Sequence, residues 1–124
     1  MRCRFLLLIP IALFSIAAQA MPTKSCKDYA ARLPNLPMRQ CEEAQLHDMQ
    51  ARSVLGRPIW GRDMAATKSA LRVLVLGGIH GDEMSSSALV FHWIGLAQSE
   101  PALQDMAIHW RFIPTLNPDG MFAK

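Results

Sequence analysis

The sequence predicts an α/β protein with a partial mixed or parallel sheet, helices on the faces of that sheet, and a short helical segment before it. The run from Leu71 to Leu76 is almost continuously apolar and rich in branched residues, which is typical of a strand buried on both faces. The apolar residues from Ser85 to Gln98 predict a helix with a broad buried face, and Ile108 to Thr115 predicts a second strand. Strand, helix and strand at this spacing predict a right-handed parallel unit.

The first twenty residues have the pattern of a secretory signal peptide. Two arginines precede an apolar run from Phe5 to Ala18, and Ala18-Gln19-Ala20 fits the small-residue rule for cleavage. The run is 14 residues long. A bilayer-spanning helix needs roughly 20, so a retained membrane anchor is the weaker interpretation. We therefore expect residues 1–20 to be removed and the mature chain, secreted or periplasmic and free of the membrane, to begin near Met21.

The charge balance gives no support for a nucleic-acid partner. The chain has 13 basic and 10 acidic residues, and loss of Arg2 and Arg4 with the signal peptide leaves 11 basic residues. No basic run interleaved with aromatic residues is present. We expect no nucleic-acid binding.

The segment from residue 21 to residue 52 is predicted to be helical. Ser25 to Leu33 and Arg39 to Arg52 are compatible with helices, and the two prolines between them must break a helix. We therefore expect a small helical hairpin. On its second arm His47 follows Glu43 by four residues, a spacing that favours a solvated ion pair over a binding site.

Two cysteines remain once the signal peptide has been removed. Cys3 leaves with that peptide, so Cys26 and Cys41 form the only pair in a compartment that is oxidising if export occurs. We expect a disulfide that joins the arms of the helical hairpin, and two free, half-buried thiols are the alternative. Neither cysteine has a second Cys or His at ligand spacing, which argues against a zinc role for them.

Turn residues separate the remaining segments. Ser53 to Asp63 has the short apolar stretches and turn residues of an irregular strand pair or sheet edge, and Ala65 to Ala70 is predicted to be a polar turn. Asn117-Pro118-Asp119-Gly120 closes the second strand with a strong turn sequence.

Candidate metal ligands follow the first strand. Ligands of open α/β sheets bind outside the carboxyl ends of the strands, where Gly77 to Glu83 is expected to lie. His80 and Glu83 are three residues apart, so their side chains can point the same way. An imidazole and a carboxylate would supply two of the three protein ligands of a catalytic zinc, leaving a position for water. The alternative is a loop histidine beside a carboxylate that starts a helix.

The whole arrangement resembles the zinc metallocarboxypeptidases related to carboxypeptidase A. The resemblance rests on the strand and Gly-Gly-Ile-His-Gly-Asp-Glu motif of residues 71–83, the helix after it, the strand that closes on Asn117 to Gly120, and the lead-in from Ser53 to Ile59. It implies that residues 53–124 are the amino-terminal part of a zinc carboxypeptidase catalytic domain. The Gly-Asp pair inside the motif is most similar to the bacterial murein peptide amidases, which cut peptides derived from peptidoglycan.

The resemblance implies a role for several residues. His80 and Glu83 become ligands of Zn²⁺, and Asn117 to Gly120 takes a structural role. Asp82 would orient His80 from behind or, equally, cap the following helix. The expected substrate is a small peptide, and the expected reaction is hydrolysis of an amide bond by metal-activated water.

The chain also departs from this family. The resemblance covers only the amino-terminal part of the usual catalytic domain, so the second histidine ligand, the substrate-binding arginines and the general base are all expected beyond residue 124. No catalytic residue is therefore expected in this chain. His92, inside the helix, and His109, inside the second strand, are predicted to be packing or surface residues. We expect the isolated chain to lack peptidase activity.

Three other functions fit the sequence less well. A zinc deacylase resembling succinylglutamate desuccinylase or aspartoacylase would share a Gly-x-His-Gly-x-Glu element, but those enzymes act on cytosolic metabolites and the signal peptide argues against this alternative. A serine hydrolase using Ser85 to Ser87 lacks a Gly-x-Ser-x-Gly elbow, and serines that open a helix are ordinary capping residues. The non-enzyme alternative is a truncated, non-catalytic relic.

Overall fold

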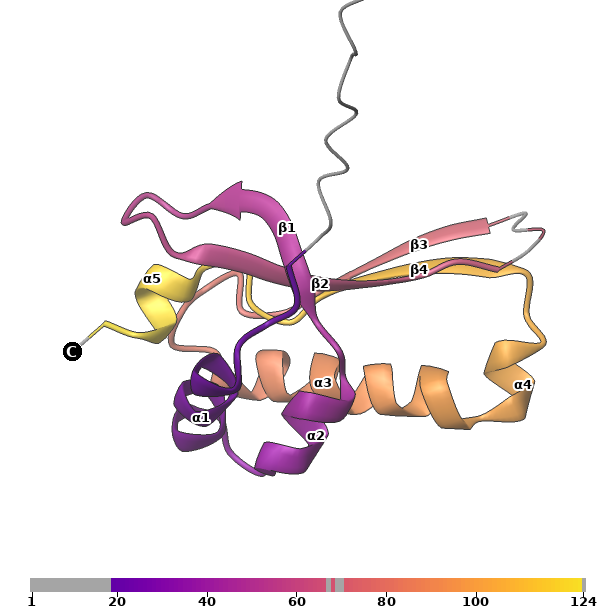
Figure 1. Ribbon diagram of the computed structural model, residues 1–124, viewed down its shortest axis with the longest axis horizontal. Coiled ribbons are helices and arrows are strands. Elements are labelled where there is room, and N and C mark those ends of the chain that lie inside the picture. The colour runs from indigo at the N-terminus through magenta and orange to yellow at the C-terminus, as the bar shows by residue number, and fades with distance from the viewer. Residues whose placement is uncertain (1–18, 67, 69–70, 124) are drawn as a thin grey trace, which may run out of the picture.

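A computed structural model describes residues 19–66, 68 and 71–123 of the chain (Figure 1). The predicted signal peptide lies outside this part except for its last two residues, and so do three residues of the predicted polar turn. In chain order the elements are α1 (Thr23–Arg32), α2 (Met38–Glu43), β1 (His47–Arg52), β2 (Pro58–Met64), β3 (Leu71–Leu76), α3 (Met84–Ser99), α4 (Pro101–Gln104), β4 (Ile108–Ile113) and α5 (Pro118–Met121). Within the described ranges, no helix has the length and apolar character needed to cross a membrane.

The four strands form one mixed sheet in the order β1-β2-β4-β3. β3 and β4 are parallel and aligned from Leu71 opposite Ile108 to Leu76 opposite Ile113, with α3 and α4 in the connection between them. β2 pairs antiparallel with both β1 and β4. The predicted α/β class and the parallel strand-helix-strand unit are therefore confirmed.

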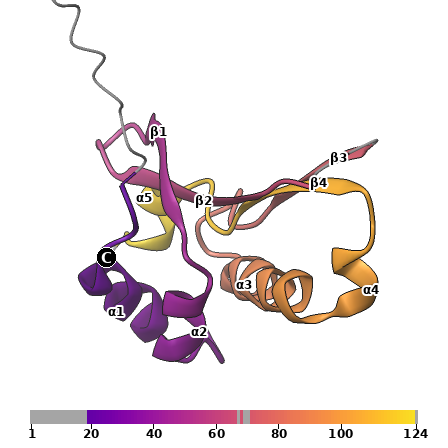
Figure 2. The same ribbon diagram turned by 45° about the vertical axis from the view of Figure 1, so that its right-hand side comes forward.

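The helices α1 to α4 gather on one side of the sheet in both views (Figures 1 and 2). The helix α3 lies against the sheet through Phe91 and Ile94, which are fully buried, and β4 contributes the buried Phe112 to the same core. Tyr29 of α1 makes an edge-to-face contact with Phe91, with ring centroids 5.8 Å apart. The core is therefore a layer between the sheet and its helices.

The prediction that β3 is buried on both faces is wrong. Leu74 and Leu76 leave 57% and 37% of their surface exposed, whereas Val73 and Val75, which alternate with them, are half-buried. Successive side chains of a strand point to opposite faces of the sheet, and the helices of the described part cover one face. β3 is also the last strand in the sheet order, so it has one neighbouring strand in the described structure.

The second helical arm is shorter than predicted. α2 ends at Glu43, and Gln45 has a φ of +49°, which turns the chain away from the helix direction. The residues from His47 to Arg52 pair instead with β2, so strand pairing overrides their local compatibility with a helix. His47 consequently contacts Asp63 across the sheet, with Nε2 3.6 Å from the carboxylate, rather than Glu43.

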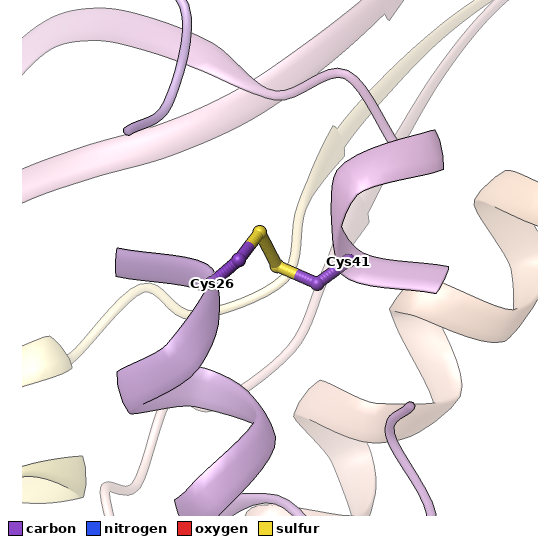
Figure 3. The surroundings of a disulfide bond; sticks show 2 residues. All are labelled: Cys26 and Cys41. Carbon is purple, nitrogen blue, oxygen red and sulfur yellow. A yellow bond between two sulfur atoms is a disulfide. The ribbon is translucent and has the colours of Figure 1, made fainter. Parts of the chain in front are cut away.

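A disulfide joins Cys26 of α1 to Cys41 of α2, as Figure 3 shows. The two Cα atoms lie 5.6 Å apart, and both residues are buried. The bond crosslinks the two arms of the hairpin, so the predicted pairing is present and the alternative of two free thiols is not.

The hairpin tip between β1 and β2 is anchored to the far end of the chain. Asp119 of α5 accepts hydrogen bonds from the Ser53 hydroxyl at 2.7 Å and the Leu55 backbone N–H at 2.9 Å. The predicted turn at residues 117–120 takes the form of the single helical turn α5, with the Asn117 side chain accepting from the Gly120 N–H at 2.9 Å. The segment predicted as an irregular strand pair or sheet edge, residues 53–63, therefore forms the hairpin turn and most of β2. The pairing of β2 with β1 shifts register between Asp48 and Arg52, and Asp119 of α5 holds the turn in place.

Candidate metal centre

The loop from Gly77 to Glu83 connects β3 to α3 and lies where the parallel strands end. Sheet pairing continues into it, because the Gly77 N–H donates to Ile113 O at 2.9 Å and the Asn117 N–H donates to Gly78 O at 2.8 Å. The loop is therefore fixed against the segment that follows β4. This is the sheet edge where open α/β proteins bind their ligands.

Glycines allow this loop to pack against its neighbours. Gly78 has a φ of +54°, and a Cβ there would lie 2.5 Å from the Ser87 hydroxyl oxygen. A Cβ at Gly81 would overlap the backbone of Gly120 in α5. The two glycines thus let the loop turn sharply and let its backbone touch that of α5.

The predicted ligands His80 and Glu83 come together in this loop. Nδ1 of His80 lies 3.1 Å from Oε1 of Glu83. Both side chains face solvent, with 71% and 57% of their surfaces exposed. The hydrogen bond and the negative charge of Glu83 raise the pKa of His80 above its ordinary value, with a smaller contribution from the charge of Asp82. The protonated form of the His80 ring is therefore favoured beside Glu83.

The pair fits part of a zinc site. Ligand bonds of zinc to nitrogen and oxygen are about 2.0–2.2 Å long, so two ligands at the tetrahedral angle lie about 3.3 Å apart. The observed separation of 3.1 Å between Nδ1 and Oε1 agrees with that spacing. The described residues include no group of three or more His, Cys, Asp or Glu that could hold a metal ion. His80 and Glu83 therefore bring together two donors of the type that zinc prefers. The described residues supply no third ligand beside them.

Two carboxylates, Asp82 and Glu83, lie at the start of α3. Glu83 is the N-cap residue, and its side chain makes no capping hydrogen bond. Its carboxylate lies 3.1 Å from Nδ1 of His80 instead. Asp82 is exposed just before the helix and acts on His80 through its charge. Its predicted role in orienting His80 stays a prediction.

The other histidines lie elsewhere, as their positions in the sequence predicted. His92 is exposed in the middle of α3, and His109 is the second residue of β4. The ring of His109 contacts Asp63 on β2, with Nε2 3.4 Å from the carboxylate. Neither histidine is at the carboxyl end of a strand.

A hollow that borders the amino-terminal hairpin is separate from this centre. It has a volume of about 700 Å³ and is lined by residues of α1, α2, β1 and β2, including Cys26, Cys41 and Arg62. Neither His80 nor Glu83 lines it. We place the candidate site at His80 and Glu83 because their side chains carry the nitrogen and oxygen donors that zinc binds.

One residue beside the ligands was not predicted to matter. Ser86 was interpreted only as a serine that opens a helix, but its hydroxyl donates to Glu83 O at 2.7 Å and accepts from the Gly78 N–H at 3.0 Å. The sequence offered one indication of this role, because Ser86 follows Glu83 by three residues and so lies on the same helical turn. That spacing alone could not reveal the bond to Gly78, because the bond depends on how the loop folds back.

Comparison with known proteins agrees with the geometry. A family model described as zinc carboxypeptidase matches residues 34–124, which is most of the chain and includes the whole sheet and the candidate site. No curated protein and no solved structure gives a significant match. The match to the family model shows that this chain belongs to the zinc carboxypeptidase family.

Proposed function

We propose that His80 and Glu83 are two ligands of a zinc ion in a hydrolase that cleaves an amide bond of a small peptide. The observation that carries this proposal is the 3.1 Å contact between the imidazole and the carboxylate at the end of β3. Membership of the zinc carboxypeptidase family supplies the metal and the class of reaction.

The two residues have different tasks in this proposal. His80 offers a neutral nitrogen donor and Glu83 a negative oxygen donor, and their backbone is held by the end of the sheet and by α5. Zinc, when bound, supplies Lewis-acid chemistry that activates water and polarises the carbonyl to be cleaved. The exposure of both side chains leaves them accessible to the metal and to a peptide.

We propose a peptide derived from peptidoglycan as the substrate and the periplasm as the location. The similarity of Gly81-Asp82 to the murein peptide amidase motif supports the substrate. The Cys26–Cys41 disulfide supports an oxidising compartment, because disulfides persist outside the reducing cytosol.

We also propose that the chain by itself does not hydrolyse peptides. Catalytic zinc sites of proteins use three protein ligands, and two converge in the described residues. Zinc binding and hydrolysis are therefore separate expectations, and each needs its own measurement.

Zinc titration of the chain, followed by NMR, tests the site. We expect Zn²⁺ to perturb the signals of the Gly77–Glu83 loop in the wild-type chain and in His92→Ala, and to leave that loop unperturbed in His80→Ala. His92→Ala is the matched control because His92 is also an exposed histidine, on α3. Equal responses in His80→Ala and the wild type would refute the ligand assignment.

Hydrolysis is measured on the same samples with a murein tripeptide and excess zinc. We expect no cleavage by the wild-type chain. Cleavage that disappears in His80→Ala would overturn the proposal of an inactive chain and would leave the zinc site standing.

A further inference from the structure

We propose that Ser86 is a positioning residue that holds the loop carrying His80 and Glu83 in its metal-binding shape. This inference rests on the proposed zinc site, and it assigns to Ser86 a role beyond helix capping. It makes no claim that Ser86 touches the metal or the substrate.

The Ser86 hydroxyl bridges the two ends of the loop. It accepts a hydrogen bond from the Gly78 N–H at 3.0 Å and donates one to Glu83 O at 2.7 Å. A serine hydroxyl can donate one bond and accept others, so one side chain can join a donor to an acceptor. Gly78 and Glu83 are the residues that bracket the sharp turn through His80. The bridge therefore closes the loop at its base.

The neighbouring serines cannot take this role. Ser87 is fully buried, and its hydroxyl is paired with Thr115, 3.2 Å away, on the segment after β4. Ser85 is exposed to solvent. Successive residues of a helix point in different directions, and of the three serines Ser86 is the one whose hydroxyl bonds to both Gly78 and Glu83.

The loop needs such a bridge because side-chain packing does not fix its ligands. His80 and Glu83 have 71% and 57% of their surfaces exposed, so few contacts restrain them. Their relative position therefore depends on the backbone that carries them. Loss of partners that support metal ligands typically lowers metal affinity 10- to 100-fold.

Zinc affinity of three variants of the full chain tests the proposal. We expect Ser86→Ala to raise the Kd for Zn²⁺ about tenfold. Ser86→Thr keeps the hydroxyl and should bind zinc as the wild type does, and Ser85→Ala is the matched control in the same run of serines. Thermal unfolding of each variant separates a local effect from loss of the fold. Equal affinity in Ser86→Ala and the wild type would overturn the role of Ser86 while leaving the zinc site intact.

A metal-free measurement keeps the two proposals distinguishable. The Glu83 carboxylate beside Nδ1 favours the His80 tautomer with its proton on that nitrogen, which ¹⁵N NMR detects in the neutral ring. We expect Ser86→Ala to shift the His80 tautomer balance toward that of the exposed His92, and Ser86→Thr to restore it. If the wild type binds no zinc, the proposed function fails and this signal alone decides the role of Ser86. An unchanged tautomer balance in Ser86→Ala then overturns that role.

Discussion

The two faces of the sheet are made by the same strands and are stabilised in different ways. On the covered face, Phe112 and Trp110 of β4 stack with centroids 5.7 Å apart and pack into the core with Val75 of β3. On the open face, Arg111 of β4 donates two hydrogen bonds to Asp63 of β2, at 2.7 and 3.0 Å. Phe112 and Arg111 are adjacent in sequence, so one peptide unit separates an apolar core from a solvated ion pair.

This difference shows where the stability of the molecule should reside. Burial of an aromatic side chain contributes several kcal/mol, whereas a solvent-accessible ion pair contributes about 1 kcal/mol or less. The open face also exposes Leu74 and Leu76, whose apolar surface contributes little in the described structure. We therefore expect the covered face to dominate the free energy of unfolding.

The largest expected effect comes from truncating the covered face. Phe112 is 1% exposed, so Phe112→Ala should lower the free energy of unfolding by about 3–5 kcal/mol through lost burial and a residual cavity. Leu74→Ala on the open face is the matched control and should cost less than about 1 kcal/mol. Urea unfolding of both variants measures the contrast. Similar losses for the two variants would show that the open face is covered in solution.

Removal of the disulfide should have the next largest effect. The bond closes a loop between residues 15 apart in sequence, for which chain entropy gives about 3 kcal/mol. The double variant Cys26→Ala, Cys41→Ala should lose about that much stability in urea. Wild-type chain treated with a reductant should lose a similar amount, and an unaffected wild type would contradict the contribution assigned to the bond.

The smallest effect is expected on the open face and depends on pH. Hydrogen bonds from Arg111, with help from His109 and His47, hold the pKa of Asp63 below its ordinary value. A carboxyl group whose pKa is depressed by folding stabilises the fold above the ordinary value, and this contribution is lost as pH falls through the folded pKa. Asp63→Asn should therefore cost about 1 kcal/mol at pH 7.

The difference between Asp63→Asn and the wild type should vanish in acid, below the folded pKa of Asp63. Urea unfolding across the pH range measures it, with Asp105→Asn, on an exposed residue after α4, as the control. A difference that persists unchanged in acid would mean that the Asp63 side chain acts through packing rather than charge.

Features with a local signal could be predicted from the sequence. The apolar run of β3, the apolar pattern of α3 and the turn at Asn117 depend on neighbouring residues, and all three are present. The proximity of His80 to Glu83 follows from their spacing on one turn. The pairing of Cys26 with Cys41 followed from the absence of another partner.

The features that were missed depend on distant parts of the chain. β1 forms because the edge of β2 is free to pair with it. The composition of residues 47–52 is compatible with a helix and does not indicate that a pairing strand follows. The burial of β3 could not be predicted because branched apolar residues indicate a strand without showing which faces are covered. The bond from Gly78 to Ser86 likewise exists only once the loop has folded back onto α3.

The contact between Gly81 and Gly120 has a consequence for the order of events during synthesis. The loop that bears His80 packs against a backbone segment made 39 residues later. The tip of the β1–β2 hairpin also depends on that segment, because Asp119 accepts the hydrogen bonds that hold the tip in place. A nascent chain that has emerged only through α3 therefore has both candidate ligands but lacks the surface that holds their loop. The site should take shape late, when α5 emerges and closes two distant parts of the chain in a single step.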